Sequence, residues 1–135
     1  MITNSAAETR ELGARLAQKL KAGDVLLLEG DLGAGKSELA RGVAKGLEVQ
    51  ETVTSPSFTI LNVYESGRLP LFHFDWYRLD SSEELYELGM DEYLGGDGIA
   101  VVEWAERCPD AVPENVLRIR LEVTGGESRR ITVND

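Results

Sequence analysis

The chain has 135 residues, of which 24 are acidic and 14 basic, for a formal net charge of −10. A surface of this sign repels phosphate backbones, so we expect no autonomous binding to DNA or RNA. No apolar run approaches the roughly 20 residues of a membrane span, and a single cysteine, Cys108, excludes an intrachain disulfide. With no signal-peptide pattern at the N-terminus, these features predict one cytoplasmic domain over residues 1–135, with Cys108 as an inert, partly buried thiol.

The first predicted element is a helix that begins at a capping box. Ser5-Ala6-Ala7-Glu8 has a serine and a glutamate three residues apart, which satisfy free N–H groups at a helix start. Leu12, Leu16 and Leu20 follow at helical spacing. Gly23 is placed to end the helix.

A glycine-rich loop at residues 30–37, G-D-L-G-A-G-K-S, matches the phosphate-binding pattern G-x-x-x-x-G-K-[ST]. It follows an apolar stretch at residues 24–29 that predicts a buried strand, and it precedes a helix predicted over residues 38–47. In this setting backbone N–H groups and the helix N-terminus bind the α- and β-phosphates. Lys36 reaches the β- and γ-phosphates, and the Ser37 hydroxyl is a ligand for Mg²⁺. The loop therefore predicts binding of a nucleoside triphosphate with Mg²⁺.

The middle of the chain predicts a loop, a hairpin and a short helix. Residues 54–57, T-S-P-S, form a loop because the residue before a proline disfavours helix. Strand-like segments at residues 58–64 and 69–74 have the spacing of an antiparallel hairpin. A second capping box at residues 81–84 opens a helix that continues through Leu88.

The last third of the chain predicts three strands. Residues 99–102 are fully apolar, which is typical of a strand at the centre of a sheet. Strands near residues 116–123 and 129–133 flank Gly125-Gly126, and apolar and charged side chains alternate in the first of them. Together the elements predict an α/β domain of the P-loop NTPase type, a mixed sheet with parallel core strands, antiparallel edge hairpins and helices on both faces.

Two carboxylates follow apolar strands and are candidates for positioning Mg²⁺. Glu103 follows the more continuously apolar strand, at a carboxyl end beside the glycine-rich loop, so we favour it for the metal, directly or through water. Asp75 follows residues 71–74 and would orient the attacking water or a switch loop. Either carboxylate could instead cap a backbone N–H at its strand end.

Four further side chains each have two interpretations. Thr54 stands where a switch threonine senses the γ-phosphate in other NTPases, or is a plain turn residue. Arg78 could stabilise transition-state charge, although an ion pair with a nearby acid is the favoured interpretation. His73 is favoured as a packed strand residue over a catalytic base, and Trp104 as a side chain packed against the site over a partner-docking residue. No N-K-x-D or T-K-x-D motif follows the loop, which favours adenine over guanine.

Four segments together carry a resemblance to a known family. They are the glycine-rich loop, T-S-P-S-F at residues 54–58, H-F-D-W-Y-R-L at residues 73–79 and V-E-W-A-E at residues 102–106. With them the chain resembles the TsaE-type bacterial ATPases of tRNA threonylcarbamoyladenosine biosynthesis, from about Thr9 to the C-terminal hairpin. The resemblance implies weak ATP hydrolysis in support of TsaD- and TsaB-type transferase subunits. An acidic chain fits this role, because those subunits can make most of the contacts to tRNA.

The same resemblance implies roles for individual residues. Those expected at ATP are Asp31, Leu32, Gly33, Ala34, Gly35, Lys36, Ser37, Glu38 and, close to the adenine, Thr9. Those expected to act in hydrolysis are Lys36, Asp75, Glu103 and the switch threonine Thr54. Ser37 and Glu103 are expected at Mg²⁺, and Trp104 as a functional aromatic. Ser37 replaces the more usual threonine and keeps its hydroxyl, whereas Trp76 replaces an aliphatic residue with no effect that we can derive.

Two other functions remain as alternatives. A small-molecule kinase would need an arginine-rich lid and an acceptor pocket, for which 135 residues leave little room. A nucleotide-gated binding module would use ATP to order a docking face and hydrolysis to release the partner. The absence of an evident arginine finger or lid predicts slow ATP turnover by the chain alone.

Overall fold

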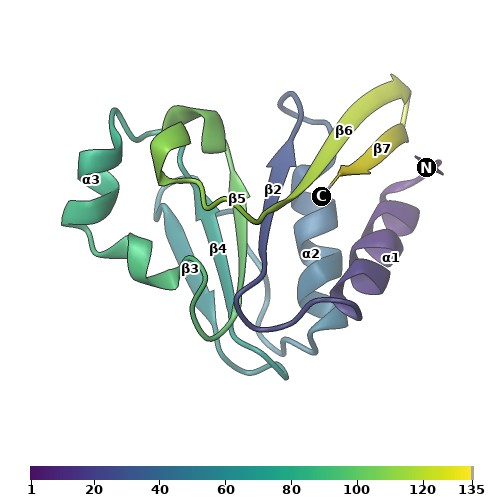
Figure 1. The fold of residues 1–135 in the computed structure, drawn as a ribbon. Helices are drawn as coiled ribbons and strands as arrows, with labels where there is room; N and C mark the ends of the chain where they lie inside the picture. The colour runs from purple at the N-terminus through teal and green to yellow at the C-terminus, as the bar shows by residue number, and fades with distance from the viewer. Residues whose placement is uncertain (135) are drawn as a thin grey trace.

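The computed structural model describes residues 1–134 and shows a seven-stranded mixed sheet with helices packed on it (Figure 1). The strands are β1 (Ile2–Thr3), β2 (Val25–Glu29), β3 (Leu61–Tyr64), β4 (Leu71–Asp75), β5 (Ile99–Glu103), β6 (Leu117–Gly125) and β7 (Ser128–Asn134). The α-helices are α1 (Ala6–Ala17), α2 (Lys36–Gly46) and α3 (Ser82–Glu87), and short 3₁₀ turns span Met90–Tyr93, Ala105–Arg107 and Pro109–Ala111.

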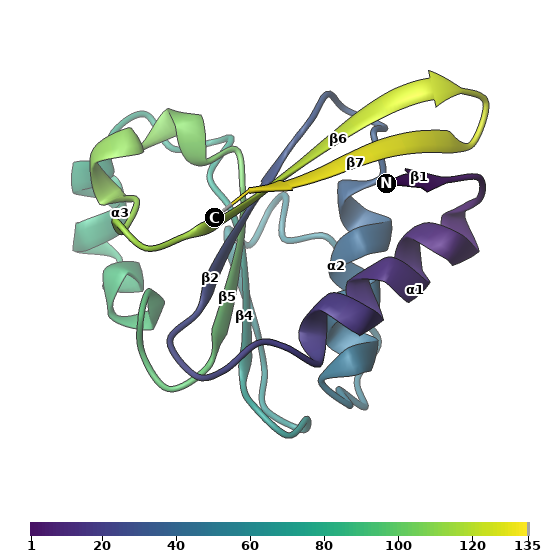
Figure 2. The ribbon, with the colours of Figure 1, turned by 45° about the vertical axis from the view of Figure 1, so that its right-hand side comes forward.

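The strand order is β1-β7-β6-β2-β5-β4-β3. The four central strands, β6, β2, β5 and β4, run parallel, while β3 pairs antiparallel at one edge and β7 and β1 at the other. Helices α1 and α2 cover one face, and α3 lies with the 3₁₀ turns on the other (Figure 2). The predicted fold class is therefore confirmed.

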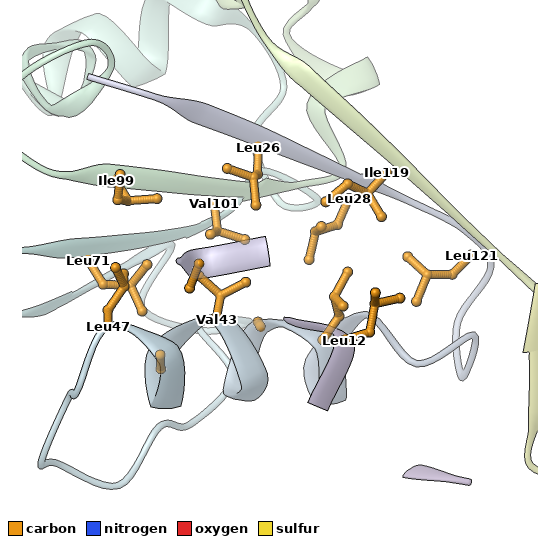
Figure 3. Close-up of a cluster of buried hydrophobic side chains, with 14 of the residues drawn as sticks. Leu12, Leu26, Leu28, Val43, Leu47, Leu71, Ile99, Val101, Ile119 and Leu121 are labelled. Carbon is orange, nitrogen blue, oxygen red and sulfur yellow. The ribbon is translucent and has the colours of Figure 1, made fainter. Parts of the chain in front are cut away.

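Strand β2 shows why the central strands read as continuous apolar runs. Leu26 and Leu28 point into a core beneath α1 and α2, part of which is drawn in Figure 3. Val25 and Leu27 point into a second core on the opposite face, with Phe74, Trp76 and other large side chains. Because both faces are covered, every position of β2 except its last is buried, and every position of β4 and β5 is buried.

The first helix is shorter than predicted. It ends at Ala17, and the next N–H groups bond three residues back, with Leu20 N–H donating to Ala17 O at 3.2 Å. These bonds tighten the last turn and end the α-helix, so Leu20 packs against the core from the segment that follows. Gly23 was predicted to cap this helix, but its left-handed conformation serves the turn into β2, where its N–H donates to Gly98 O at 2.9 Å.

The first strand of the hairpin predicted at residues 58–74 also begins later than predicted, at Leu61. Residues 57–60 form a turn closed by a 2.8 Å bond from Ile60 N–H to Pro56 O, and Phe58 projects into solvent with 80% of its surface exposed. Strand β1 was not predicted, because two residues carry no periodic signal. In β6, Ile119 and Leu121 are buried as the alternation indicated, but Val123 extends beyond the core and is 55% exposed.

Helices α1 and α2 cross at close range because glycines line their contact. A β-carbon on Gly42 would lie 2.0 Å from Arg10 O. One on Gly13 would lie 2.4 Å from Leu39 O, and one on Gly46 would lie 2.5 Å from a carbonyl oxygen of α1. The crossing thus leaves no room for side chains at these positions. Among the helices of residues 1–134, none has the length and apolar character needed to cross a bilayer.

Candidate functional site

The glycine-rich loop joins the end of β2 to the start of α2. Gly35 adopts φ 103° directly before Lys36, the first residue of α2, a conformation that costs glycine little. A β-carbon on Gly30 would lie 2.6 Å from Leu121 O, so this glycine allows the loop to pass close to β6. The first N–H groups of α2 have no partner within the helix and carry a partial positive charge, which favours an anion at this end.

A cleft of about 550 Å³ opens beside this helix end, a size suited to a nucleotide. Eight of the predicted residues line it: Leu32, Gly33, Gly35, Lys36, Ser37, Glu38, Asp75 and Glu103. Trp104, expected as a functional aromatic, and Arg78, weighed for transition-state charge, also line it, and Ser55, Ser57, Phe58, Tyr77 and Arg129 complete the lining. Four predicted residues lie outside the lining: Thr9, Asp31, Ala34 and Thr54.

The two carboxylates are the last residues of adjacent parallel strands, and Asp75 pairs in register with Glu103. Each keeps only 6% of its surface exposed. One oxygen of Asp75 accepts a bond from Tyr77 N–H at 2.9 Å, so this carboxylate does cap a backbone N–H. Its other oxygen accepts a long 3.5 Å bond from the Ser57 hydroxyl. Asp75 therefore contacts the loop at residues 54–57.

Glu103 is bonded to a side chain rather than to a backbone N–H. Its Oε2 lies 2.7 Å from His73 Nε2, inside the sheet, where the imidazole is 2% exposed. His73 Nδ1 has no hydrogen-bond partner among the described residues. His73 is thus a packed strand residue, as favoured, and it also fixes the orientation of Glu103. No local pattern predicts this contact, because 30 residues separate the two.

Lys36 and Trp104 contact each other in the lining of the cleft. Lys36 Nζ lies 3.9 Å from the centroid of the indole ring, a cation–π contact. Trp104 has a left-handed backbone, with φ 61°, directly after β5. Its ring packs against Tyr77 with centroids 4.9 Å apart. Trp104 therefore packs against the site, as the favoured interpretation had it, and it contacts the lysine expected to bind phosphate.

Three cationic side chains line the cleft, together with the carboxylates of Glu38, Asp75 and Glu103. Besides Lys36, the lining includes Arg78 and Arg129. The expected ion pair of Arg78 is wrong for the described residues, where its guanidinium lies over the exposed Phe58 ring, 4.5 Å from the centroid. Sequence reasoning missed Arg129, which bonds to carbonyl groups of the glycine-rich loop. With the carboxylates beside them, these cations fit a polyanionic ligand that brings a metal cation with it.

The two predicted threonines lie away from the cleft. Thr54 is exposed; its N–H donates to the Tyr64 hydroxyl at 3.1 Å, and its carbonyl oxygen accepts from Asn62 Nδ2 at 3.2 Å. Thr9 is 2% exposed, with its hydroxyl 2.7 Å from that of Thr3. A switch role for Thr54 would therefore require movement of its loop, and the proximity of Thr9 to adenine stays a prediction.

The donor set of the cleft fits magnesium held on nucleotide phosphates. Within residues 1–134, no three His, Cys, Asp or Glu side chains form a group that could hold a metal ion. Mg²⁺ in phosphate sites usually takes one or two protein oxygens, with phosphates and water completing its shell. The Ser37 hydroxyl and the Glu103 carboxylate, both in the lining, can supply those oxygens.

Cys108 lies apart from the cleft and is fully buried, rather than partly buried as predicted. Burial raises the pKa of its thiol above the ordinary value. Because the thiolate is the reactive form, native protein should leave Cys108 unlabelled by a thiol reagent in mildly alkaline buffer, whereas denatured protein should label fully. Rapid stoichiometric labelling of the native protein would contradict this prediction. The measurement uses a disulfide reagent that releases a coloured thiolate when it labels a thiol, and follows the absorbance of that thiolate.

Comparison with known proteins identifies the family of the chain. The model of the family described as "Threonylcarbamoyl adenosine biosynthesis protein TsaE" matches residues 3–131. The tRNA threonylcarbamoyladenosine biosynthesis protein TsaE of Bacillus subtilis is 44% identical over 125 residues, which cover 93% of this chain and 78% of the relative. TsaE of Treponema pallidum is 42% identical over 132 residues, which cover 98% of this chain and 97% of the relative.

A solved structure gives the same answer. The crystal structure of YdiB from Bacillus subtilis matches with a TM-score of 0.85 at 40% sequence identity, covering 98% of this chain and 82% of that one. Similarity in sequence and in fold thus extends over nearly the whole chain, and the resemblance carried by four short motifs is confirmed. The chain belongs to the TsaE family of threonylcarbamoyl adenosine biosynthesis proteins.

Proposed function

We propose that the chain is a cytoplasmic protein that binds ATP, hydrolyses it weakly, and is required for threonylcarbamoyladenosine modification of tRNA. It acts beside the TsaD- and TsaB-type transferase subunits and leaves most contacts with tRNA to them. The observation that carries the proposal is one cleft shared by the glycine-rich loop, Lys36 and the strand-end carboxylates Asp75 and Glu103. Membership of the TsaE family supplies the pathway.

Several residues in and behind the cleft have roles in this function. Loop N–H groups and Lys36 bind the phosphates. Ser37 and Glu103 hold Mg²⁺, which when bound supplies positive charge to the phosphate oxygens. Asp75 orients the attacking water, and its contact with Ser57 links it to the loop that carries Thr54. The hydrogen bond between His73 and Glu103 holds the Glu103 carboxylate in one orientation at the end of β5.

Partner dependence follows from the rim of the cleft. Leu32 and Phe58 line it and are 91% and 80% exposed, and exposed apolar groups that cluster mark surfaces that another protein covers. Arg78 is the arginine of the cleft that could stabilise transition-state charge, but its guanidinium packs on the Phe58 ring. A partner that docks on the Phe58 ring would release Arg78 to reach the phosphates. Without a partner Arg78 stays on that ring, so the chain alone hydrolyses ATP slowly.

The proposal is tested by reconstituting tRNA threonylcarbamoylation from the TsaD- and TsaB-type subunits with and without this protein. We expect modified nucleoside only when it is present, slow ATP turnover when it is alone, and loss of hydrolysis with retained ATP binding in Glu103→Gln. The amide keeps the size of the carboxylate but lacks the charge that Mg²⁺ requires.

Two results would sink the proposal: rapid ATP turnover without partners, or modification that is equally efficient without the protein. The Glu103→Gln variant also separates hydrolysis from gating. If it supports full modification without hydrolysing ATP, the nucleotide gates binding and its hydrolysis only releases a partner.

A further inference from the structure

Arg129 connects the C-terminal hairpin to the glycine-rich loop. Its Nε donates to Ala34 O at 3.0 Å, and its Nη2 donates to Gly33 O at 3.2 Å. On the other side of the guanidinium, Nη1 donates to the carbonyl oxygens of Gly126, at 2.7 Å, and Ser128, at 2.9 Å. One planar group thus fixes two consecutive carbonyls of the loop to the turn between β6 and β7.

We propose that Arg129 is a positioning residue for phosphate binding, acting through the peptide planes of the loop. This role rests on the proposed function. In a trans peptide the carbonyl and the N–H point in opposite directions. With the Ala34 carbonyl held by Arg129, the N–H of Gly35 points away from the guanidinium. That N–H has no hydrogen-bond partner in the described part of the chain, so it is free for a phosphate oxygen.

The loop needs such a restraint because of its glycines. Gly33 and Gly35 have φ of 84° and 103°, and a β-carbon on Gly33 would meet nothing within 4 Å. Glycine has more accessible backbone conformations than any other residue, so an unrestrained loop would lose more entropy when it orders around a ligand. A guanidinium donates along fixed directions and can hold two acceptors at once, whereas a lysine ammonium is a point charge.

The chain offers a matched control in the next residue. Arg130 carries the same charge on the same strand, but its side chain is exposed on the opposite face. Removing either arginine changes the net charge equally. Only removal of Arg129 releases the two loop carbonyls, so the pair separates a positioning effect from long-range attraction of the phosphates.

The experiment titrates Mg²⁺-ATP and Mg²⁺-ADP into wild type, Arg129→Ala, Arg129→Lys and Arg130→Ala by calorimetry, with steady-state ATPase assays and thermal unfolding alongside. We expect Arg129→Ala to weaken binding and raise KM about tenfold, the loss of roughly one or two net hydrogen bonds, with kcat unchanged. Arg130→Ala should bind like wild type, and Arg129→Lys should recover only part of the affinity. In ¹⁵N-glycine spectra the Gly35 amide should shift with ADP in wild type and less in Arg129→Ala.

Several results would overturn the role. Wild-type affinity in Arg129→Ala would do so, as would full recovery in Arg129→Lys or an equal loss in Arg130→Ala, because charge alone would then suffice. If Arg129→Ala fails to fold, Arg129→Lys compared with Arg130→Lys carries the test, and only the first should bind weakly. If wild type binds no nucleotide, the proposed function itself is wrong. If wild type binds nucleotide and the variants behave as above, only the role of Arg129 is wrong.

Discussion

Gly42→Ala is expected to lower the free energy of unfolding by at least about 2 kcal/mol, even though alanine is the better helix former. The intrinsic preference of a helix interior favours alanine over glycine by about 1 kcal/mol. Against it stand three contacts of the new β-carbon with Arg10 of α1, at 2.0 Å from its oxygen, 2.7 Å from its carbonyl carbon and 2.9 Å from its Cα. All three atoms are backbone, so no side chain can swing aside and the helices must separate.

Thermal unfolding followed by circular dichroism measures this effect. A loss of this size should lower the Tm by roughly 8 °C in a domain of this length. Lys45→Ala, at an exposed position of the same helix, is the control and should stay within about 0.5 kcal/mol of wild type. A Tm equal to or above that of wild type in Gly42→Ala would contradict the close crossing. Because α2 begins at the glycine-rich loop, nucleotide binding should weaken in parallel.

Much of the fold could be predicted because its signals are local. The apolar runs of β2 and β5 and the loop pattern at residues 30–37 each lie within ten residues, and side-chain periodicity reports them directly. The place of Glu103 beside the glycine-rich loop followed from one more rule, since the carboxyl ends of parallel strands share an edge. The register that pairs Asp75 with Glu103 is known only from the structure. Boundaries failed where tertiary contacts decide them, as at Gly23, whose turn is closed by Gly98.

The rest of the site depends on contacts between distant segments. Arg129 lies 95 residues from the carbonyl of Ala34 that it binds, and no local pattern reports such a pair. One signal was available: Arg129 and Ile131 share a face of β7, and Ile131 is fully buried. An arginine on the core side of a strand must find acceptors. The close contact between α1 and α2 at their glycines was likewise not predictable, because helical periodicity indicates which face is apolar and not how closely two helices approach.

Lys36 depends on both a local motif and distant contacts. The motif predicted its role in phosphate binding, but no local pattern predicted the residues that surround it. It is 6% exposed, and no carboxylate in residues 1–134 lies within ion-pair distance. Its cation rests on the face of Trp104 instead. A buried cation without a counterion is unfavourable in the free protein and favourable once phosphates arrive. The site thus carries a cost to stability that its ligand relieves.

Lys36→Ala should therefore weaken Mg²⁺-ATP binding by about 100-fold, through the loss of charge-assisted bonds to the phosphates, while the Tm of the free protein stays equal or rises. In wild type, Lys36 exchanges its contact with Trp104 for bonds to the phosphates when ATP binds. The phosphate bonds are the stronger of the two, because a phosphate carries a full charge and an indole face does not. Calorimetric titration and thermal unfolding of the same samples measure both quantities.

Lys45→Ala serves again as the control, because it removes one lysine charge from the exposed face of the same helix. It should leave both the affinity and the Tm near wild type. Unchanged affinity in Lys36→Ala would remove the lysine from the phosphate site. A clear fall in Tm would mean that the contact with Trp104 stabilises the free protein by more than burial of the charge costs it, and that Lys36 is held for the fold rather than for its ligand.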